Sequence, residues 1–292
     1  MALNRILASL AGVGTAVAGL TAAITAAGAA EPKPWGIGFQ PAASPTAEQI
    51  HSFNDLLLIL ISAIVVFVLA LLLYASWRFS EKRNPTPSRT THNTVIEVLW
   101  TVIPVIILVI IAVPSFKLLY FADRVEEADM TIKAIGRQWY WSYEYPDDGD
   151  FTFDANMVPD EDLEEGQPRL LATDYPVVLP VDTNIRILVT ASDVLHSFAV
   201  PAFGIKLDGV PGRINETWVR ITEPGTYYGQ CSELCGTGHS YMPIMVKAVS
   251  KDEYQAWVRT AQEEFARVDE PVERGPDESP AVQFAKAAET AQ

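Results

Sequence analysis

Residues 230–243 of the chain read QCSELCGTGHSYMP and contain both of its cysteines and one of its four histidines. Four possible metal ligands follow one another at intervals of four, four and three residues: Cys231, Cys235, His239 and Met242. Thiolate, imidazole and thioether groups all bind soft or borderline metal ions. Glycines and a proline oppose a regular helix, so we expect a loop that wraps around a bound group. His196 lies upstream in SDVLHSF and is a further candidate ligand.

Three simple interpretations of this loop compete. A disulfide between Cys231 and Cys235 would suit an exported protein, but it leaves the other three candidate ligands without a joint purpose. Two cysteines and two histidines can also fill a tetrahedral zinc site, although zinc has no use for the thioether. The third interpretation is chance clustering.

Copper uses every residue of the set. A blue copper centre takes two histidines, one cysteine and a distant methionine, so the second cysteine needs another role. Two thiolates four residues apart on a folded loop can bridge two copper ions, each completed by one histidine. Met242 would then be a weak ligand to one ion, and a backbone carbonyl of the loop, most simply that of Glu233, could serve the other. Bridging sulfurs spread one electron over both metals, which favours an electron relay without an open position for a substrate.

Composition sets limits on partners. The formal net charge of −15 excludes non-specific nucleic-acid binding as a main activity and favours a cationic partner. Only two cysteines are present, so no disulfide framework is expected.

The N-terminus has the three parts of a secretory signal peptide over residues 1–30. Arg5 precedes an apolar run, and small residues follow at 27–29. An uncleaved membrane anchor is the alternative. We expect the mature chain to begin near Ala30 or Glu31, with residues 31–55 forming an exported segment that is extended from Pro32 to Pro45.

Two apolar segments predict a transmembrane hairpin. Residues 56–77 contain no charge over 22 positions, and about 20 apolar residues cross a bilayer as a helix. We expect helices over 56–78 and 95–122, the second bent by Pro104 and Pro114. The connecting loop, 79–94, and its flank carry Arg78, Lys82, Arg83 and Arg89 against the single acid Glu81, so this loop is expected in the cytoplasm.

Beyond Asp129 the pattern changes to short apolar or alternating runs that indicate strands. These are Met130–Ile135, Gln138–Tyr145, Val177–Leu179, Ile185–Ala191, His196–Val200, Thr217–Ile221, Gly225–Gly229 and Met245–Val249. They predict an all-β sandwich or barrel within 123–250. Ser250 and Glu253 form a capping-box pattern before a helix over 251–267, and a mobile tail is expected over 268–292.

Three stretches together resemble subunit II of an aa3-type cytochrome c oxidase: the loop from Gly229 to Pro243, DVLHS at 193–197 and QWYWSYEY at 138–145. The resemblance extends from about His51 to Trp257 and includes the hairpin. It implies a cupredoxin-like sandwich and a dinuclear copper centre, CuA, held by His196, Cys231, the carbonyl of Glu233, Cys235, His239 and Met242. Quinol oxidase relatives lack these ligands and are disfavoured.

The resemblance also implies three further roles. The side chain of Glu233 would help to bind magnesium at the junction with subunit I; otherwise it is a solvated or ion-paired acid. Trp139 would receive the electron from cytochrome c, although it can also be one of several aromatic residues packed along a strand, the role that we prefer for Trp141. Glu97 would stand at the mouth of a proton path into subunit I; otherwise it is an interfacial acid facing water.

Acidic residues crowd the segment from Tyr140 to Tyr175. Eleven acids stand there against the single base Arg169: Glu144, Asp147, Asp148, Asp150, Asp154, Asp160, Glu161, Asp162, Glu164, Glu165 and Asp174. Such a run is usually a solvated face, but beside an electron acceptor it would attract a basic cytochrome c. The positions that match the family's docking carboxylates are Glu144, Asp174 and Asp193.

These features predict the copper-bearing subunit of a respiratory oxidase in a bacterial inner membrane, with its C-terminal domain in the periplasm. Cytochrome c, subunit I, other oxidase subunits and membrane lipid are the expected partners. Haem would be held only by the partner subunit, where oxygen is reduced and protons are pumped. The alternatives are a nitrous oxide reductase-like domain that receives electrons, and a copper carrier or assembly protein.

Overall fold

The computed structural model describes residue 30, residues 32–123 and residues 127–265. The expected signal peptide therefore lies outside the described residues, apart from Ala30, and so does the expected tail over 268–292.

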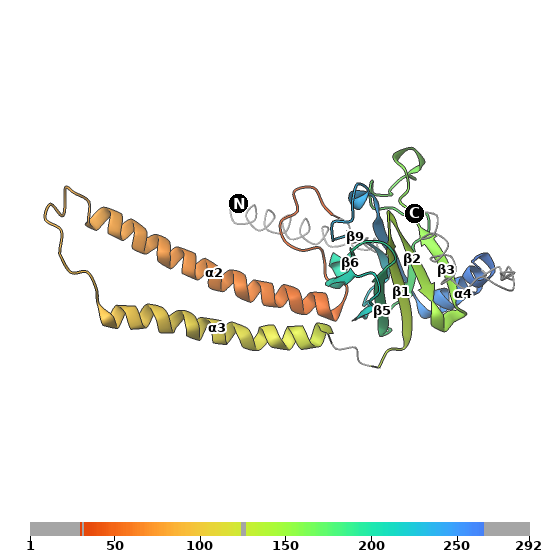
Figure 1. Ribbon diagram of the computed structural model, residues 1–292, viewed down its shortest axis with the longest axis horizontal. Coiled ribbons are helices and arrows are strands. Elements are labelled where there is room, and N and C mark those ends of the chain that lie inside the picture. Colours follow the sequence, from red (N-terminus) through yellow and green to blue (C-terminus); the bar gives the residue numbers. More distant parts are fainter. Residues whose placement is uncertain (1–29, 31, 124–126, 266–292) are drawn as a thin grey trace, which may run out of the picture.

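Two long helices, α2 (Pro45–Arg78) and α3 (Thr94–Asp123), lie side by side and project from one end of a folded domain (Figure 1). Ser44 caps α2, because its side chain accepts a hydrogen bond from the backbone N–H of Ala47, and Pro45 occupies the first turn. The helix thus begins before the uncharged run does. α3 continues through both Pro104 and Pro114. By length and composition both helices can cross a membrane, and none of the most apolar window of either is buried.

The domain is a β-sandwich, as the sequence predicted. One sheet has the order β3–β2–β1–β5–β8 and the other the order β4–β10–β9–β6–β7. The first contains β1 (Met130–Arg137), β2 (Tyr140–Tyr145), β3 (Phe151–Ala155), β5 (Ile185–Ala191) and β8 (Asn215–Val219). The second contains β4 (Val177–Pro180), β6 (His196–Val200), β7 (Ile205–Gly209), β9 (Gly225–Cys231) and β10 (Pro243–Val249). The pairs β1–β5 and β4–β10 are parallel, and the other paired strands are antiparallel.

Alternating side chains build the core between the sheets. In β5 every second residue is buried, from Ile185 to Ala191, as expected for a strand with one face inward. Two strands were not predicted from the sequence. β3 is only five residues long and follows an Asp- and Gly-rich turn, and β7 is an edge strand that fully buries only its first and last residues. Their apolar patterns are correspondingly weak.

The capping box predicted for the C-terminal helix is present in α4 (Lys251–Glu264). Ser250 Oγ accepts from the N–H of Glu253, and the Glu253 carboxylate accepts from the N–H of Ser250. Tyr254, Val258 and Ala261 are buried against the sandwich. In Figure 1, α4 lies on the side of the domain away from the hairpin.

Both membrane helices are attached directly to the sandwich. At the start of α2, Ser44 Oγ donates to the carbonyl of Phe203 at 2.8 Å. At the end of α3, the indole N–H of Trp218 in β8 donates to the carbonyl of Phe121 at 3.0 Å, and the two rings meet edge to face. These contacts fix the direction in which the sandwich faces relative to the hairpin.

Candidate metal centre

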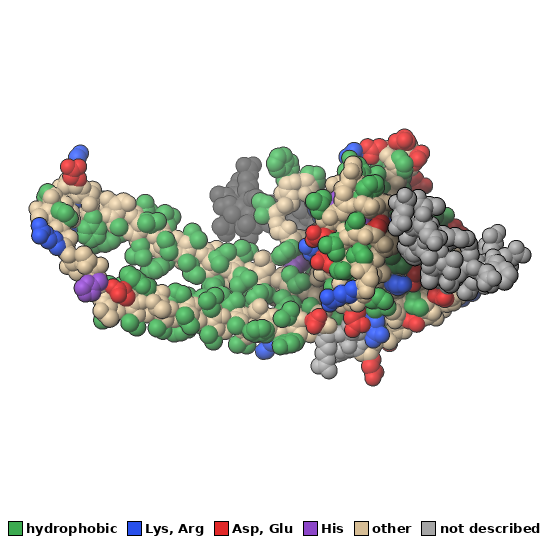
Figure 2. All heavy atoms as spheres, viewed as in Figure 1, with side chains coloured by type: hydrophobic (Ala, Val, Ile, Leu, Met, Phe, Trp, Pro, Cys, Tyr) green, Lys and Arg blue, Asp and Glu red, His purple; other side chains and the backbone are tan. Residues whose placement is uncertain are grey.

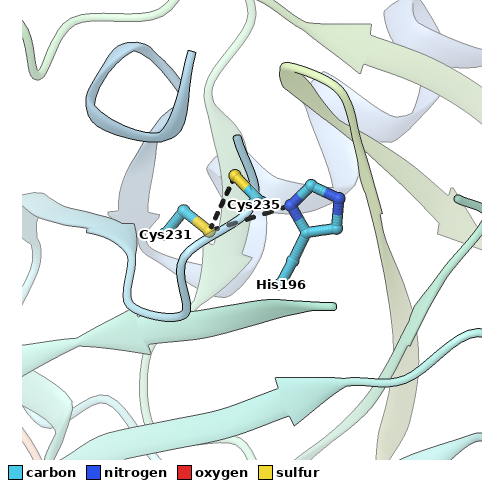
Figure 3. Close-up of side chains that lie close together, drawn as sticks. All are labelled: His196, Cys231 and Cys235. Carbon is cyan, nitrogen blue, oxygen red and sulfur yellow. Dashed lines mark hydrogen bonds between the residues drawn. The ribbon is translucent and has the colours of Figure 1, made fainter. Parts of the chain in front are cut away.

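The candidate ligands meet where two adjacent strands of the second sheet end. His196 begins β6, and Cys231 ends β9, which pairs with β6 through Phe198 and Cys231. The loop between β9 and β10 then returns the remaining candidates to the same place. Figure 3 shows His196 directed toward the two cysteines. Hydrogen bonds hold the loop: Ser232 N–H donates to the carbonyl of Ser197 at 2.9 Å, and Trp141 Nε1 donates to that of Met242 at 3.3 Å.

The distances pair each thiol with its own imidazole. The two Sγ atoms are 3.9 Å apart and both cysteines are free, whereas a disulfide needs about 2.05 Å. Nδ1 of His196 lies 3.8 Å from Cys231 Sγ, and Nδ1 of His239 lies 3.6 Å from Cys235 Sγ. The weaker donors are also divided: the carbonyl oxygen of Glu233 is 3.3 Å from Cys231 Sγ, and Met242 Sδ is 3.5 Å from Cys235 Sγ.

This donor set fits a pair of soft metal ions. Metal–sulfur bonds of about 2.3 Å can together span up to about 4.6 Å, so sulfurs 3.9 Å apart can both reach one ion. Ligand atoms of His196, Cys231 and Cys235 all lie within 4.8 Å of one another, and all three residues are buried. Two thiolates with one imidazole on each side, a thioether and a carbonyl are donors that copper prefers.

Glycine makes room for the first histidine. A Cβ on Gly136 in β1 would lie 2.7 Å from ring carbons of His196, closer than any ordinary contact. His196 is fully buried beneath this strand, and its ring also meets Trp141 edge to face at 6.1 Å. Trp141 itself is fully buried and packs on Phe198, so it has a core role.

Asp193 orients His196, a role that the sequence analysis missed. Its Oδ1 lies 2.9 Å from Nε2 of the imidazole, which leaves Nδ1 facing Cys231. The same carboxylate accepts from the N–H groups of Gln138 and Val194, each at 2.7 Å. Burial alone would raise the pKa of Asp193, but the hydrogen bonds from His196 and the two backbone groups outweigh it and lower the pKa. A carboxylate on the outer nitrogen of a metal-binding histidine is a common supporting contact. The sequence shows only that Asp193 lies three residues before His196, and this spacing does not indicate which way the carboxylate faces.

The two thiols differ in acidity. Burial disfavours both thiolates, but hydrogen bonds from His196 and from backbone groups near Cys231 lower the pKa of Cys231 to about 6. Burial and the neighbouring Cys231 raise the pKa of Cys235. The pKa of His196 is raised because its bonds to Cys231 and Asp193 outweigh its burial. Without metal, the site therefore ionises one thiol readily and retains the proton of the other.

Trp139 connects this site to the surface. Its indole N–H donates to the carbonyl of Cys235 at 3.1 Å, and Gln138 Nε2 donates to the same oxygen at 2.8 Å. The ring lies against Gly238, where a Cβ would be 2.4 Å from ring carbons. The side chain is still 37 % exposed. It therefore reaches both solvent and a backbone group of a candidate ligand.

The other predicted acids have distinct surroundings. The half-buried Glu233 carboxylate makes no hydrogen bond or ion pair with the part of the chain that the structure describes. Glu97, at the start of α3, accepts from the backbone N–H of Asn93 at 3.2 Å and so helps to cap that helix. The carboxylates of Glu233 and Glu97 are therefore not candidate copper ligands.

Two of the predicted docking acids also have partners within the chain. Glu144 pairs with Lys133 at 2.9 Å, and Asp174 accepts from the N–H of Asn156 at 2.7 Å. Many other acids of this segment, among them Asp147, Asp150, Glu161, Asp162, Glu164 and Glu165, are exposed. Figure 2 shows acidic side chains gathered over the sandwich end of the molecule, while the hairpin surface is mostly apolar.

Comparison with known proteins finds two family matches. Residues 130–249 match the periplasmic domain of cytochrome c oxidase subunit II, and residues 32–118 match the transmembrane domain of the same subunit. A probable cytochrome c oxidase subunit 2 from Rickettsia bellii is 54 % identical over 79 % of this chain and 86 % of its own length. Cytochrome c oxidase subunit 2 of Cereibacter sphaeroides is 45 % identical over 87 % of this chain and 92 % of its own length. The crystal structure of the periplasmic domain of subunit II from Bradyrhizobium japonicum is 53 % identical, with a TM-score of 0.47, and covers 49 % of this chain and 100 % of its own.

Proposed function

The chain belongs to the cytochrome c oxidase subunit II family, and from this premise we propose that it passes electrons from cytochrome c to the haem of subunit I through two copper ions. Membership makes it a subunit of an oxidoreductase with two membrane spans and a periplasmic-type domain. The ligands in this proposal are His196, Cys231, the carbonyl of Glu233, Cys235, His239 and Met242.

One observation carries the proposal: two free thiols 3.9 Å apart, each with a different imidazole beside it. Copper bound there supplies a one-electron couple shared by two ions. The protein's part is to hold the donors still. Burial of His196, Cys231, Cys235 and Met242 excludes water, and every donor of the set is used, so no position remains for a substrate.

Trp139 is the residue through which an electron arrives. Its exposed edge can touch a docked protein, while its N–H bonds the Cys235 carbonyl. The acidic residues over 144–174 attract a basic cytochrome c from a distance. Glu144, Asp174 and Asp193, which have partners within the chain, contribute mainly their charge, and exposed acids such as Glu164 and Glu165 meet the donor's lysines.

Two acids serve the contact with subunit I. The Glu233 carboxylate, which has no partner among the described residues, is a hard oxygen ligand suited to magnesium, and the backbone carbonyl of the same residue faces Cys231. It therefore links the copper loop to a metal shared with the partner. Glu97 stands at the loop end of the hairpin, where protons would be taken up for the chemistry in subunit I; haem belongs to that subunit.

The location is the inner membrane of a bacterium. The basic loop between α2 and α3 stays in the cytoplasm, which puts the copper-binding sandwich in the periplasm. Other oxidase subunits and lipid cover the exposed apolar helices.

Copper stoichiometry tests this function. The full chain, purified in detergent and supplied with copper, should bind two ions and show one unpaired electron shared by both. Cys235→Ser should abolish the shared signal. Ser232→Ala removes a hydroxyl of the same loop that donates to the carbonyl of Gln230, so it should leave the signal intact. Uptake of one ion, or a bond between the two sulfurs in the copper-loaded protein, would overturn the proposal.

A further inference from the structure

Residues 32–42, the N-terminal loop, are fastened to the sandwich at both ends. Before the loop, the N–H of Ala30 donates to the carbonyl of Thr226 at 3.1 Å, beside a bridge from Ala30 to Tyr227 in β9. After it, the N–H of Ala43 donates to the carbonyl of Ala202 at 2.8 Å, and Thr222 N–H donates to the carbonyl of Ala43 at 3.0 Å. Both ends of the loop are therefore held by the folded domain.

The tip of this loop presents large apolar side chains outward. Trp35 is 98 % exposed and Ile37 102 %, so within the described chain neither has any cover. Phe39 is also exposed over one part of its surface, while its ring stacks on His51 of α2 at 4.8 Å. Two neighbouring apolar side chains without cover indicate contact with something other than water.

The loop lies beside residues 51–58 of α2. A hollow of about 830 Å³ separates the two and is lined by Lys33, Ile37 and Phe39 on one side and by His51, Asn54, Asp55 and Leu58 on the other. Figure 1 shows the loop running back alongside the first turns of α2. It thus reaches past the sandwich toward the membrane-spanning part of the helix.

The residues of α2 that line this hollow lie at the start of its uncharged run, where we place the edge of the hydrocarbon core. The uncharged run of α2 starts at Leu56 and ends at Trp77. Its 22 residues span about 33 Å as a helix, close to the thickness of a bilayer core of about 30 Å. With the core placed over this run, His51, Ser52, Asn54 and Asp55 fall in the headgroup layer, and so does the loop beside them.

We propose that the N-terminal loop inserts Trp35 and Ile37 into the headgroup and upper acyl region of the leaflet nearest the sandwich. Tryptophan favours this region because its ring is apolar and its N–H can bond water or phosphate. Lys33, on the same loop, brings a positive charge to the phosphate level. Leu58 of α2 lines the same hollow as Ile37 and Phe39, and both Leu58 and its neighbour Ile59 are exposed. The loop is then a third attachment to the bilayer, and through its two fastened ends it limits the tilt of the sandwich.

Fluorescence quenching by brominated lipids tests the insertion. The full chain, placed in lipid nanodiscs, is compared with Trp35→Phe in ordinary phosphatidylcholine and in phosphatidylcholine brominated near the headgroup end of its acyl chains. Trp35 is one of seven tryptophans, so the emission lost on bromination should be smaller in Trp35→Phe than in the wild type. Trp257→Phe, which removes an indole ring of α4 that packs on Tyr145 of β2, should leave that loss unchanged.

The assembled oxidase gives a second measurement. Lipids that carry a photoreactive group near the headgroup should label peptides that contain residues 32–42. Equal bromolipid quenching of the wild type and Trp35→Phe, with Trp35 quenched instead by a water-soluble quencher, would overturn the proposal. So would labelling of the loop in the isolated chain that disappears in the assembled oxidase, because the occupant of this surface would then be another subunit.

Discussion

Oδ1 of Asp193 lies 2.9 Å from Nε2 of His196, while Nδ1 of the same ring faces Cys231. The carboxylate therefore fixes which nitrogen is turned toward the metal site. The sequence marked Asp193 as a docking charge, and the structure gives it a supporting contact to a candidate copper ligand. The two roles predict different behaviour.

Asp193→Ala should weaken copper binding by about tenfold or more, the usual effect of losing a carboxylate behind a metal-binding histidine. Asp193→Asn removes the same charge but retains an oxygen that can accept a hydrogen bond. If orientation of His196 is the main role, the Asn variant should bind copper nearly as well as the wild type in a competition titration. Equal copper affinity in all three proteins would contradict the supporting role. If both variants slow association with cytochrome c equally, the charge also contributes to docking.

Copper uptake by the metal-free chain should strengthen as pH rises. Copper binds thiolates, and the pKa of Cys231 is lowered to about 6, so this thiol is already ionised at neutral pH. Cys235 has a raised pKa and still holds its proton, which the metal must displace. Each displaced proton makes the apparent affinity rise about tenfold per pH unit, so at least that slope is expected between pH 7 and 9.

Calorimetry in two buffers with different protonation enthalpies measures the protons released on copper binding. The raised pKa of His196 adds to this number near neutral pH, because its proton must also leave. In Cys235→Ser the contribution of the second thiol should disappear. An affinity that does not change between pH 7 and 9 would contradict these assignments.

Much of the site could be predicted because its chemistry is concentrated in the sequence. Both thiols, one imidazole and the thioether lie within the twelve residues from Cys231 to Met242, and only a soft metal uses all of them. His196 is 35 residues away, and only the pairing of β6 with β9 brings it close. The role of Asp193 could not be predicted, because a carboxylate three residues before a histidine can face either solvent or the ring.

The fold, too, could be predicted where the local sequence pattern is strong and not where it is weak. The uncharged runs and the alternating strands have strong patterns, since they are set by burial or by lipid contact. β7 has Lys206 and Asp208 facing outward at a sheet edge, so few of its residues had to be apolar. The contact of Trp218 with Phe121 joins residues 97 positions apart, and no local pattern indicates it.

Trp139→Phe should slow electron transfer from cytochrome c to the copper site without changing copper content. Phenylalanine retains an aromatic ring against Gly238 but loses the hydrogen bond to the carbonyl of Cys235. Rapid mixing of reduced cytochrome c with the oxidase, followed at the copper absorption band, measures this step. Trp257→Phe is the control, since that residue of α4 packs on Tyr145 and Phe151 of the sandwich. Unchanged reduction kinetics in Trp139→Phe would remove this residue from the path.

Salt should slow the encounter with cytochrome c. The chain has a net charge of −15, with most acids of the 140–175 segment exposed. Between about 0.01 M and 0.15 M salt the screening length falls from about 30 Å to about 8 Å. We expect the association rate to fall by about tenfold or more over this range. The double change Glu164→Gln and Glu165→Gln should lower the rate at low salt only. A rate that does not respond to salt would contradict electrostatic docking.

Two variants of Glu97 can distinguish helix capping from proton uptake. The carboxylate caps α3, and it also stands where a proton could be taken up. Glu97→Gln retains an oxygen for the N–H of Asn93 but cannot carry a proton at neutral pH. Glu97→Ala loses both functions, and the lost hydrogen bond costs about 1 kcal/mol of stability. If Glu97 takes up protons, both variants should slow oxygen consumption while cytochrome c still reduces the copper site at the normal rate. If it only caps the helix, Glu97→Gln should turn over like the wild type, and Glu97→Ala should differ mainly in its melting temperature.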